Sequence, residues 1–233
     1  MPTLIDLSQE IFHKAPVLPF FPPIQVFPFM THEERSGETE AETVSPIVNT
    51  LVLCDHCSTH VDAFSHFGID RREDTIDKMP LDLFYTEAIC LDLAHCEPKA
   101  LIPILEIESA LEKDNLEIQE GDTVLLHTDH YRRTYGTEAF MTDWPGIEAD
   151  IVPYFTERGA VAFGVESLGP GIFGVSNTEV HQLCGKLNIT HYENLVNLDK
   201  LVGKGRFRFI GFPLKIRSGA GSPVRAVAVL EEN

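Results

Sequence analysis

One short stretch of the chain, residues 54–67, gathers the residue types that bind metal ions. It holds three histidines and two aspartates: His56, His60, His66, Asp55 and Asp62. The mostly apolar run 48–53 before it is typical of a strand, whose end would hold these side chains rigidly. Side chains of an extended chain alternate between two faces, so the four even-numbered residues of this group would share one face.

This pattern predicts a site for a divalent metal ion. Zinc binds neutral imidazole nitrogen and carboxylate oxygen, and a catalytic site uses about three protein ligands and leaves a position open for water. A lone His-x-x-x-His pair is common in proteins that bind no metal, so the prediction of a metal site depends on the presence of Asp62 and His66 as well. Cys54 and Cys57 have the spacing of half a zinc knuckle. The chain has no second such pair, and we interpret both as small buried residues.

The stretch resembles the His-x-Gly-Thr-His-x-Asp-x-Pro-x-His signature of the metal-dependent cyclase family, which includes bacterial kynurenine formamidases and isatin hydrolases. All four functional positions match within residues 56–66, while Ser58 stands at the glycine and Phe64 at the proline. A second resemblance lies in the last third of the chain. There His181 precedes Glu193 of a Glu-Asn-Leu sequence by twelve residues, as in the family. Without the first signature such a pair would mean little.

The resemblance implies a ligand set, a catalytic residue and a fold. The implied ligands of one or two divalent ions, Zn²⁺ or Mn²⁺, are His56, His60, Asp62, His181 and Glu193. Asp62 and Glu193 would bridge two ions, and His66 would move the proton from water to the leaving group. The implied fold is a swivelling β/β/α domain, an α/β (α+β) arrangement with a mixed sheet core and outer helices. Sequence pattern alone supports mixed α and β elements.

The implied activity is hydrolysis of an amide, a cyclic amide or a lactone in a small molecule by metal-activated water. Two alternatives stay open, an arylformamidase acting on N-formylkynurenine and a non-catalytic metal-binding protein of the same fold. In kynurenine formamidases a tryptophan of the proline-rich N-terminal segment faces the aromatic ring, and Leu18 stands there in this chain. We therefore expect poor turnover of N-formylkynurenine.

The expected substrate pocket is apolar and narrow. Its predicted walls are Leu18, Phe20, Phe21 and Phe64. A substrate carboxylate would have three candidate partners near the end of the chain, namely Lys215, Arg217 and Arg225.

Length, charge and cysteine usage restrict the class of protein further. We expect one domain, residues 1–233, because such a length suffices for a well-buried core. The formal charge of -18 repels phosphate and anionic lipid, so we expect neither nucleic acid nor membrane partners. Five cysteines without paired spacing, and no secretory or long apolar segment, predict a cytoplasmic protein. Family members form homodimers or larger assemblies, and the aromatic N-terminal segment agrees with a homo-oligomer.

Hydrophobic periodicity predicts most of the remaining elements. We expect strands at 87–93, 123–127, 161–165 and 188–195, and helices at 104–113, 145–158 and 179–186. His191 shares a strand face with Glu193. It stands where the family usually has an aliphatic residue, and is either an added donor that orients Glu193 or a surface or core histidine. His127 and His130, after the strand 123–127, are open candidates for substrate contact.

Overall fold

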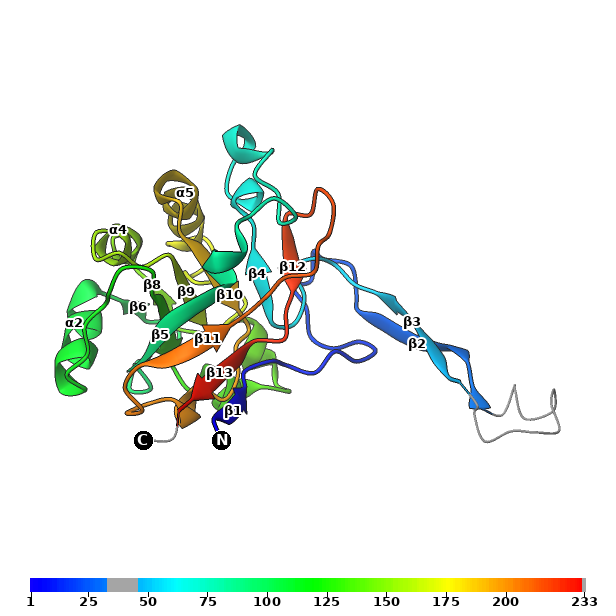
Figure 1. Ribbon diagram of the computed structural model, residues 1–233, viewed down its shortest axis with the longest axis horizontal. Helices are drawn as coiled ribbons and strands as arrows, with labels where there is room; N and C mark the ends of the chain where they lie inside the picture. The colour runs from blue at the N-terminus through cyan, green and yellow to red at the C-terminus, as the bar shows by residue number, and fades with distance from the viewer. Residues whose placement is uncertain (33–45, 232–233) are drawn as a thin grey trace.

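The computed structural model describes residues 1–32 and 46–231, and within them nine strands form one mixed sheet (Figure 1). Across the sheet the strands are β1 (Thr3–Asp6), β13 (Val227–Leu230), β11 (Phe207–Ile210), β5 (Tyr85–Asp92), β7 (Thr123–His127), β9 (Ala162–Val165), β10 (Thr190–Glu193), β4 (His60–Asp62) and β12 (Gly221–Pro223). Strands β5, β7, β9 and β10 run parallel, while β4 pairs antiparallel with β10 and β12.

The helices lie outside this sheet (Figure 1). They are α2 (Ile104–Lys113), α3 (His130–Thr134), α4 (Ile151–Thr156) and α5 (Asn177–Leu187). Short 3₁₀ helices connect the elements: η1 (Phe64–His66), η2 (Ile69–Arg71), η3 (Leu81–Phe84), η4 (Glu138–Met141) and η5 (Leu198–Lys200). No helix in the described part of the chain is long and apolar enough to cross a bilayer.

Buried apolar strands at the centre explain this arrangement. β7 and β9 are buried along their whole length, as expected for parallel strands covered on both faces. α2 buries Ile107, Ala110 and Leu111 and turns its charged side chains outward, which is the amphipathic pattern of a helix on a core. The predicted mixed α and β architecture is therefore confirmed.

The helix expected over 145–158 is shorter than predicted. Residues 146–147 instead form strand β8 (Gly146–Ile147), which pairs with β6 (Leu101–Ile102), and α4 begins only at Ile151. Gly146 packs so closely on Gly171 that a Cβ atom would meet its backbone at 2.6 Å. Only glycine permits such a close approach of two backbones at this position.

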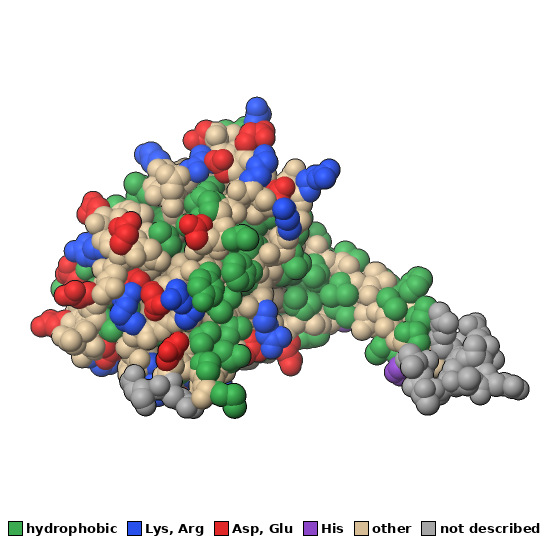
Figure 2. Space-filling model, viewed as in Figure 1, with side chains coloured by type: hydrophobic (Ala, Val, Ile, Leu, Met, Phe, Trp, Pro, Cys, Tyr) green, Lys and Arg blue, Asp and Glu red, His purple; other side chains and the backbone are tan. Residues whose placement is uncertain are grey.

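A β-hairpin projects from the body of the molecule (Figure 1). Its strands are β2 (Gln25–Met30) and β3 (Val48–Val52), which pair only with each other among the described residues. The strand predicted over 48–53 therefore exists as β3, and it belongs to this hairpin and not to the nine-stranded sheet. Apolar side chains lie along the hairpin among polar ones (Figure 2), and Phe27, Phe29 and Leu51 are exposed.

Candidate metal centre

Neighbouring strands β4 and β10 place four side chains on one face of the sheet. Their antiparallel register sets Glu193 opposite His60, and therefore His191 opposite Asp62. Because alternate residues of a strand share a face, the four side chains form one cluster. All four are buried.

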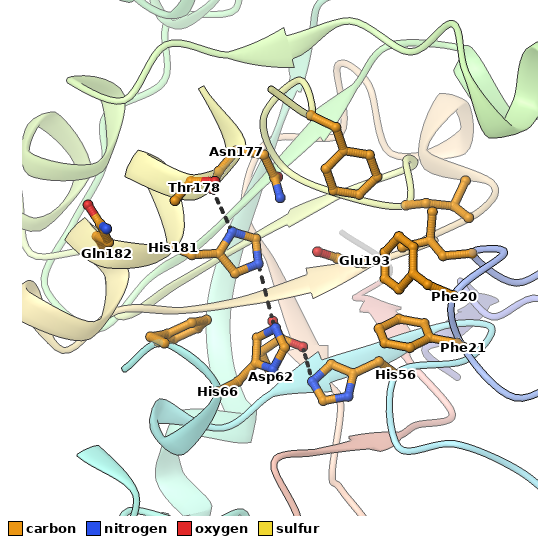
Figure 3. A pocket seen from close by; sticks show the side chains of 14 residues that line it. Phe20, Phe21, His56, Asp62, His66, Asn177, Thr178, His181, Gln182 and Glu193 are labelled. Atoms are coloured by element: carbon orange, nitrogen blue, oxygen red, sulfur yellow. Dashed lines mark hydrogen bonds and ion pairs between the residues drawn. The ribbon is translucent and has the colours of Figure 1, made fainter. Parts of the chain in front are cut away.

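Three further histidines reach this cluster from outside the two strands (Figure 3). His56, in the segment before β4, lies with Nε2 3.2 Å from Asp62 Oδ1. His66 on η1 and His181 on α5 each place Nε2 3.8 Å from Asp62 Oδ2. The prediction of one extended chain is wrong for His56 and His66, since β4 spans only His60–Asp62. The side chains nevertheless converge on Asp62.

Hydrogen bonds at Nδ1, the ring nitrogen that points away from Asp62, orient three of the histidine rings. His56 Nδ1 lies 2.9 Å from the Asp55 carboxylate, while His60 and His181 donate from Nδ1 to backbone carbonyls at 3.0 and 2.8 Å. These acceptors offer no proton, so each neutral ring carries its proton on Nδ1 and presents a lone pair at Nε2. A cation could coordinate all three Nε2 atoms, and at neutral pH it would displace a proton from His56.

Several buried polar atoms at this cluster have no hydrogen-bond partner among the described residues. They are His56 Nε2, His60 Nε2 and both carboxylate oxygens of Asp62. Such atoms are rare, because each costs about 1–3 kcal/mol. Two groups of ligand atoms lie within 4.8 Å of one another: His56, Asp62 and His66, and Asp62, His181, His191 and Glu193. Nitrogen and oxygen donors of this kind fit a divalent cation such as Zn²⁺ or Mn²⁺.

The electrostatics of the cluster favour positive charge. Burial alone would raise the pKa of Asp62, but the surrounding histidines, His66 foremost, hold it well below its usual value. Burial would likewise lower the pKa of His56, yet the Asp62 and Asp55 carboxylates raise it to about 9. Burial, reinforced by His56, lowers the pKa of His66 despite the attraction of Asp62. His66 is therefore neutral at pH 7 and able to accept a proton.

Ser58 holds the ligand segment in a backbone conformation that favours glycine. Its φ is 51°, in the left-handed region, its buried Oγ has no hydrogen-bond partner within the described chain, and its carbonyl accepts the His60 Nδ1 proton. The left-handed region costs a residue with a Cβ about 1–2 kcal/mol. A glycine at this position would avoid that cost. Part of the gain in folding free energy would be offset, because glycine has greater conformational freedom in the unfolded chain.

We expect Ser58→Gly to stabilise the protein by about 1 kcal/mol, because it relieves this strain. Thermal unfolding should show a Tm higher by about 2–4 °C, with the metal content unchanged. Ser58→Ala is the matched control, since it removes the unpaired hydroxyl but keeps the Cβ. An alanine variant as stable as the glycine variant would assign the effect to the hydroxyl rather than to the backbone.

A cavity of about 430 Å³ opens onto the cluster (Figure 3). Its apolar wall consists of Leu18, Phe20, Phe21, Phe67, Leu168 and Phe173. Its polar lining comprises His56, Asp62, His66, Asn177, Thr178, His181, Gln182 and Glu193. Three of the four predicted pocket residues thus lie where expected, and no lysine or arginine is among the described residues of the lining.

Phe64 is the exception, and its prediction as a pocket residue is wrong. Its side chain is 8% exposed and packs into the main hydrophobic core, with the Arg71 guanidinium over its ring. The strand alternation ends at Asp62 and η1 begins at Phe64, so the chain turns this ring inward and brings Phe67 to the cavity instead.

The basic residues suggested for a substrate carboxylate lie elsewhere. Arg225 forms a two-fold ion pair with Asp6, at 2.8 and 2.6 Å. Lys215 and Arg217 do not line the cavity either. His127 faces Glu166 at 3.6 Å and His130 Nε2 contacts the Phe140 carbonyl, and neither histidine lines the cavity.

The polar residues of α5 in the cavity are ones that sequence reasoning missed. Thr178 and Gln182 lie three residues before and one residue after His181. Residues three or four apart share one face of a helix, so Thr178 lies on the same face of α5 as His181 and Gln182. Helical spacing around His181 was the available signal. For Phe173, which follows a Gly-Pro-Gly turn, the sequence offered none.

Both the sheet and the cluster are those of a metal-dependent hydrolase. The family model described as "Putative cyclase" matches residues 5–171, and the chain belongs to this cyclase family. The family resemblance is thereby confirmed, and the first signature lies within the matched residues.

Relatives with assigned activities cover most of the chain. An isatin hydrolase of Roseibium aggregatum is 30% identical over 197 residues, 78% of this chain and 74% of that protein. A kynurenine formamidase of Bacillus anthracis is 30% identical over 228 residues, 96% of this chain and 95% of that protein. A crystal structure of an isatin hydrolase bound to the product analogue thioisatinate superposes with a TM-score of 0.85 at 26% identity, covering 99% of this chain and 93% of that one.

Proposed function

We propose that this protein hydrolyses the amide or lactone bond of a small, uncharged cyclic compound with the help of a divalent metal ion. The observation that supports this most is the set of unpaired, buried nitrogen and oxygen atoms beneath an apolar cavity. The residues that would hold the ion or ions are His56, His60, Asp62, His181 and Glu193.

A bound divalent ion would lower the pKa of its water to about 7 and would polarise the scissile carbonyl. The chain's own residues do the rest. His66, partly exposed at the cavity wall, takes the proton from water and returns it to the leaving nitrogen or oxygen. Phe20, Phe21 and Phe173 hold the ring of the substrate and exclude water from the centre.

The lining of the cavity selects the substrate. N-formylkynurenine carries a charged amino-acid group, and the described lining offers no lysine or arginine to its carboxylate. Leu18 offers no indole surface for its ring. A neutral cyclic amide such as isatin, or a neutral lactone, needs only the apolar wall and the polar face of α5. These features favour a cyclic substrate over the formamide.

Steady-state kinetics with isatin, a neutral lactone and N-formylkynurenine test the proposal. We expect kcat/KM for N-formylkynurenine below about 10⁴ M⁻¹s⁻¹, the lower end of ordinary enzyme efficiency, and at least tenfold higher values for a cyclic substrate. Parallel assays with Zn²⁺ and Mn²⁺, both suited to these donors, identify the working ion. Efficient formamide cleavage would establish the arylformamidase alternative. No turnover by a fully metal-loaded protein would establish the non-catalytic one.

The projecting hairpin supports a homodimer or a larger homo-oligomer as part of this proposal. Phe27, Phe29, Ile47 and Leu51 are 44–69% exposed on or next to it, and several large apolar side chains exposed on one element are typical of an interface. We also propose the cytoplasm as the compartment, because all five cysteines are free and reduced thiols are typical of that environment.

A further inference from the structure

One polar side chain of the cavity, that of Asn177, has a fixed orientation. Asn177 is the first residue of α5, and its Oδ1 accepts the backbone N–H of Gly171 at 3.1 Å. Only the amide oxygen can accept this hydrogen bond, so the contact determines which way the side chain points. Its Nδ2 has no acceptor among the described residues, and Figure 3 shows it directed into the cavity. Asn177 therefore presents a hydrogen-bond donor to a bound molecule.

The turn that orients the Asn177 amide is itself held firmly. The Gly171 carbonyl accepts the indole N–H of Trp144 at 2.9 Å, and the Ser176 hydroxyl accepts the Ile172 N–H at 3.1 Å. The turn packs directly on the start of α5, where a Cβ atom on Gly171 would meet Asn177 Cα at 2.7 Å. Rotation of the amide would break its hydrogen bond to Gly171. The donor is thus in place before a substrate binds, which lowers the entropic cost of binding.

Asn177 also links this donor to the proposed metal centre. Its backbone carbonyl lies 2.8 Å from Nδ1 of His181, one turn further along α5, and His181 is one of the proposed ligands. The main chain of Asn177 thus contacts the centre while its side chain reaches the cavity. A substrate whose scissile carbonyl lies at the proposed ion therefore meets a donor at a second, fixed position. Two fixed contacts orient a ring, whereas one contact leaves it free to turn.

The neighbouring polar side chains of α5 lack this restraint. Thr178 and Gln182 are exposed and line the cavity, and within the described chain neither side chain has a hydrogen-bond partner. A hydroxyl can donate or accept, and an unrestrained amide can turn to present either of its ends. These two residues therefore tolerate a donor or an acceptor on the ligand, whereas Asn177 favours an acceptor.

We propose that Asn177 is a specificity-determining residue, whose amide N–H binds a second carbonyl oxygen of the cyclic substrate while the scissile carbonyl faces the proposed ion. The cavity then favours a ring with two carbonyl groups over the same ring with one. A hydrogen bond between neutral groups changes an affinity by about three- to tenfold. This inference rests on the proposed function, because it takes the cyclic substrate and the ion from there.

Two substitutions separate contact with the substrate from support of the turn. Asn177→Asp keeps an oxygen for the Gly171 N–H but replaces the donor by a second oxygen, whereas Asn177→Leu removes both. Ser176→Ala is the matched control, because it loosens the same turn and Ser176 does not line the cavity. The ligands are phthalimide, a ring with two carbonyl groups, and isoindolin-1-one, the same ring with one. Calorimetry on zinc-loaded protein measures Kd for a ligand that is not cleaved, and KM and kcat for one that is.

We expect the parent protein to bind phthalimide about three- to tenfold more tightly than isoindolin-1-one. Asn177→Asp and Asn177→Leu should lose this preference, with a larger change in KM than in kcat and an unchanged zinc content. Ser176→Ala should keep the preference, although its Tm falls.

A parent preference retained by Asn177→Asp would show that Asn177 only supports the turn. Equal binding of the two ligands by the parent protein, or binding of neither, would overturn the proposal without any variant. A zinc-loaded parent that prefers phthalimide but cleaves no cyclic compound would reject the proposed function and leave this inference standing. Cleavage of cyclic compounds without the preference would do the reverse.

Discussion

Asp62→Ala is expected to abolish tight metal binding, because this residue faces every other proposed ligand. Both of its oxygens are buried and unpaired. They lie within 3.4 Å of Nε2 of His56 and His60 and 3.8 Å from Nε2 of His66 and His181. A ligand at 100 times its Kd stabilises the folded state by about 2.7 kcal/mol. Addition of Zn²⁺ or Mn²⁺ should therefore raise the Tm of the parent protein by about 5–10 °C and leave that of the variant unchanged.

Asp82→Ala is the matched control, since Asp82 is an exposed aspartate on η3. It should keep the full thermal shift and the full ion content. Hydrolysis by Asp62→Ala should fall to the background rate at any ion concentration that saturates the parent protein. Unchanged ion content in Asp62→Ala would contradict the assignment of the centre.

His66→Ala should lower kcat by about 10²- to 10⁴-fold, the usual contribution of a general acid–base group. Its ion content should not change, because the variant keeps His56, His60 and Asp62. Burial lowers the pKa of His66, so the ring is ready to accept a proton at pH 7. The missing ring leaves space at the open side of the cavity, and added imidazole should restore part of the rate.

Replacement of an exposed histidine serves as control for this variant. His95→Ala removes a ring that is 60% exposed on the surface, and it should keep the parent kcat. If His66→Ala instead lost its ion and retained the parent rate per bound ion, His66 would be a ligand and not the proton carrier.

The first half of the centre could be predicted from local sequence. Three imidazoles and an aspartate within a dozen residues have few explanations other than a metal, whatever the exact path of the backbone. Glu193 and His181 could be predicted only through family resemblance, because they reach Asp62 through the pairing of β4 with β10 and through the position of α5. Such tertiary contacts leave no periodic trace in a single sequence.

Other features depended on backbone details that composition does not reveal. Phe64 and Phe67 are the same residue type, and only the change from strand to 3₁₀ helix after Asp62 decides which of them lines the cavity. The apolar run at 48–53 predicted a strand, but the sequence did not reveal that this strand belongs to the projecting hairpin. For His191 the sequence left two alternatives open, a donor that orients Glu193 and a surface or core histidine, because its partners are set by a register that the sequence does not display.

The position of β4 has a consequence for the order of events during synthesis. Val61 pairs with Tyr192 on one side and with Ser222 on the other, so this short strand is enclosed only after both β10 and β12 have been synthesised. Bringing such distant segments together costs more loop-closure entropy than local pairing, and contacts of this kind slow folding. A growing chain that still lacks β10 therefore carries its histidine-rich segment without Glu193. The complete set of proposed ligands comes together only when β10 has paired with β4.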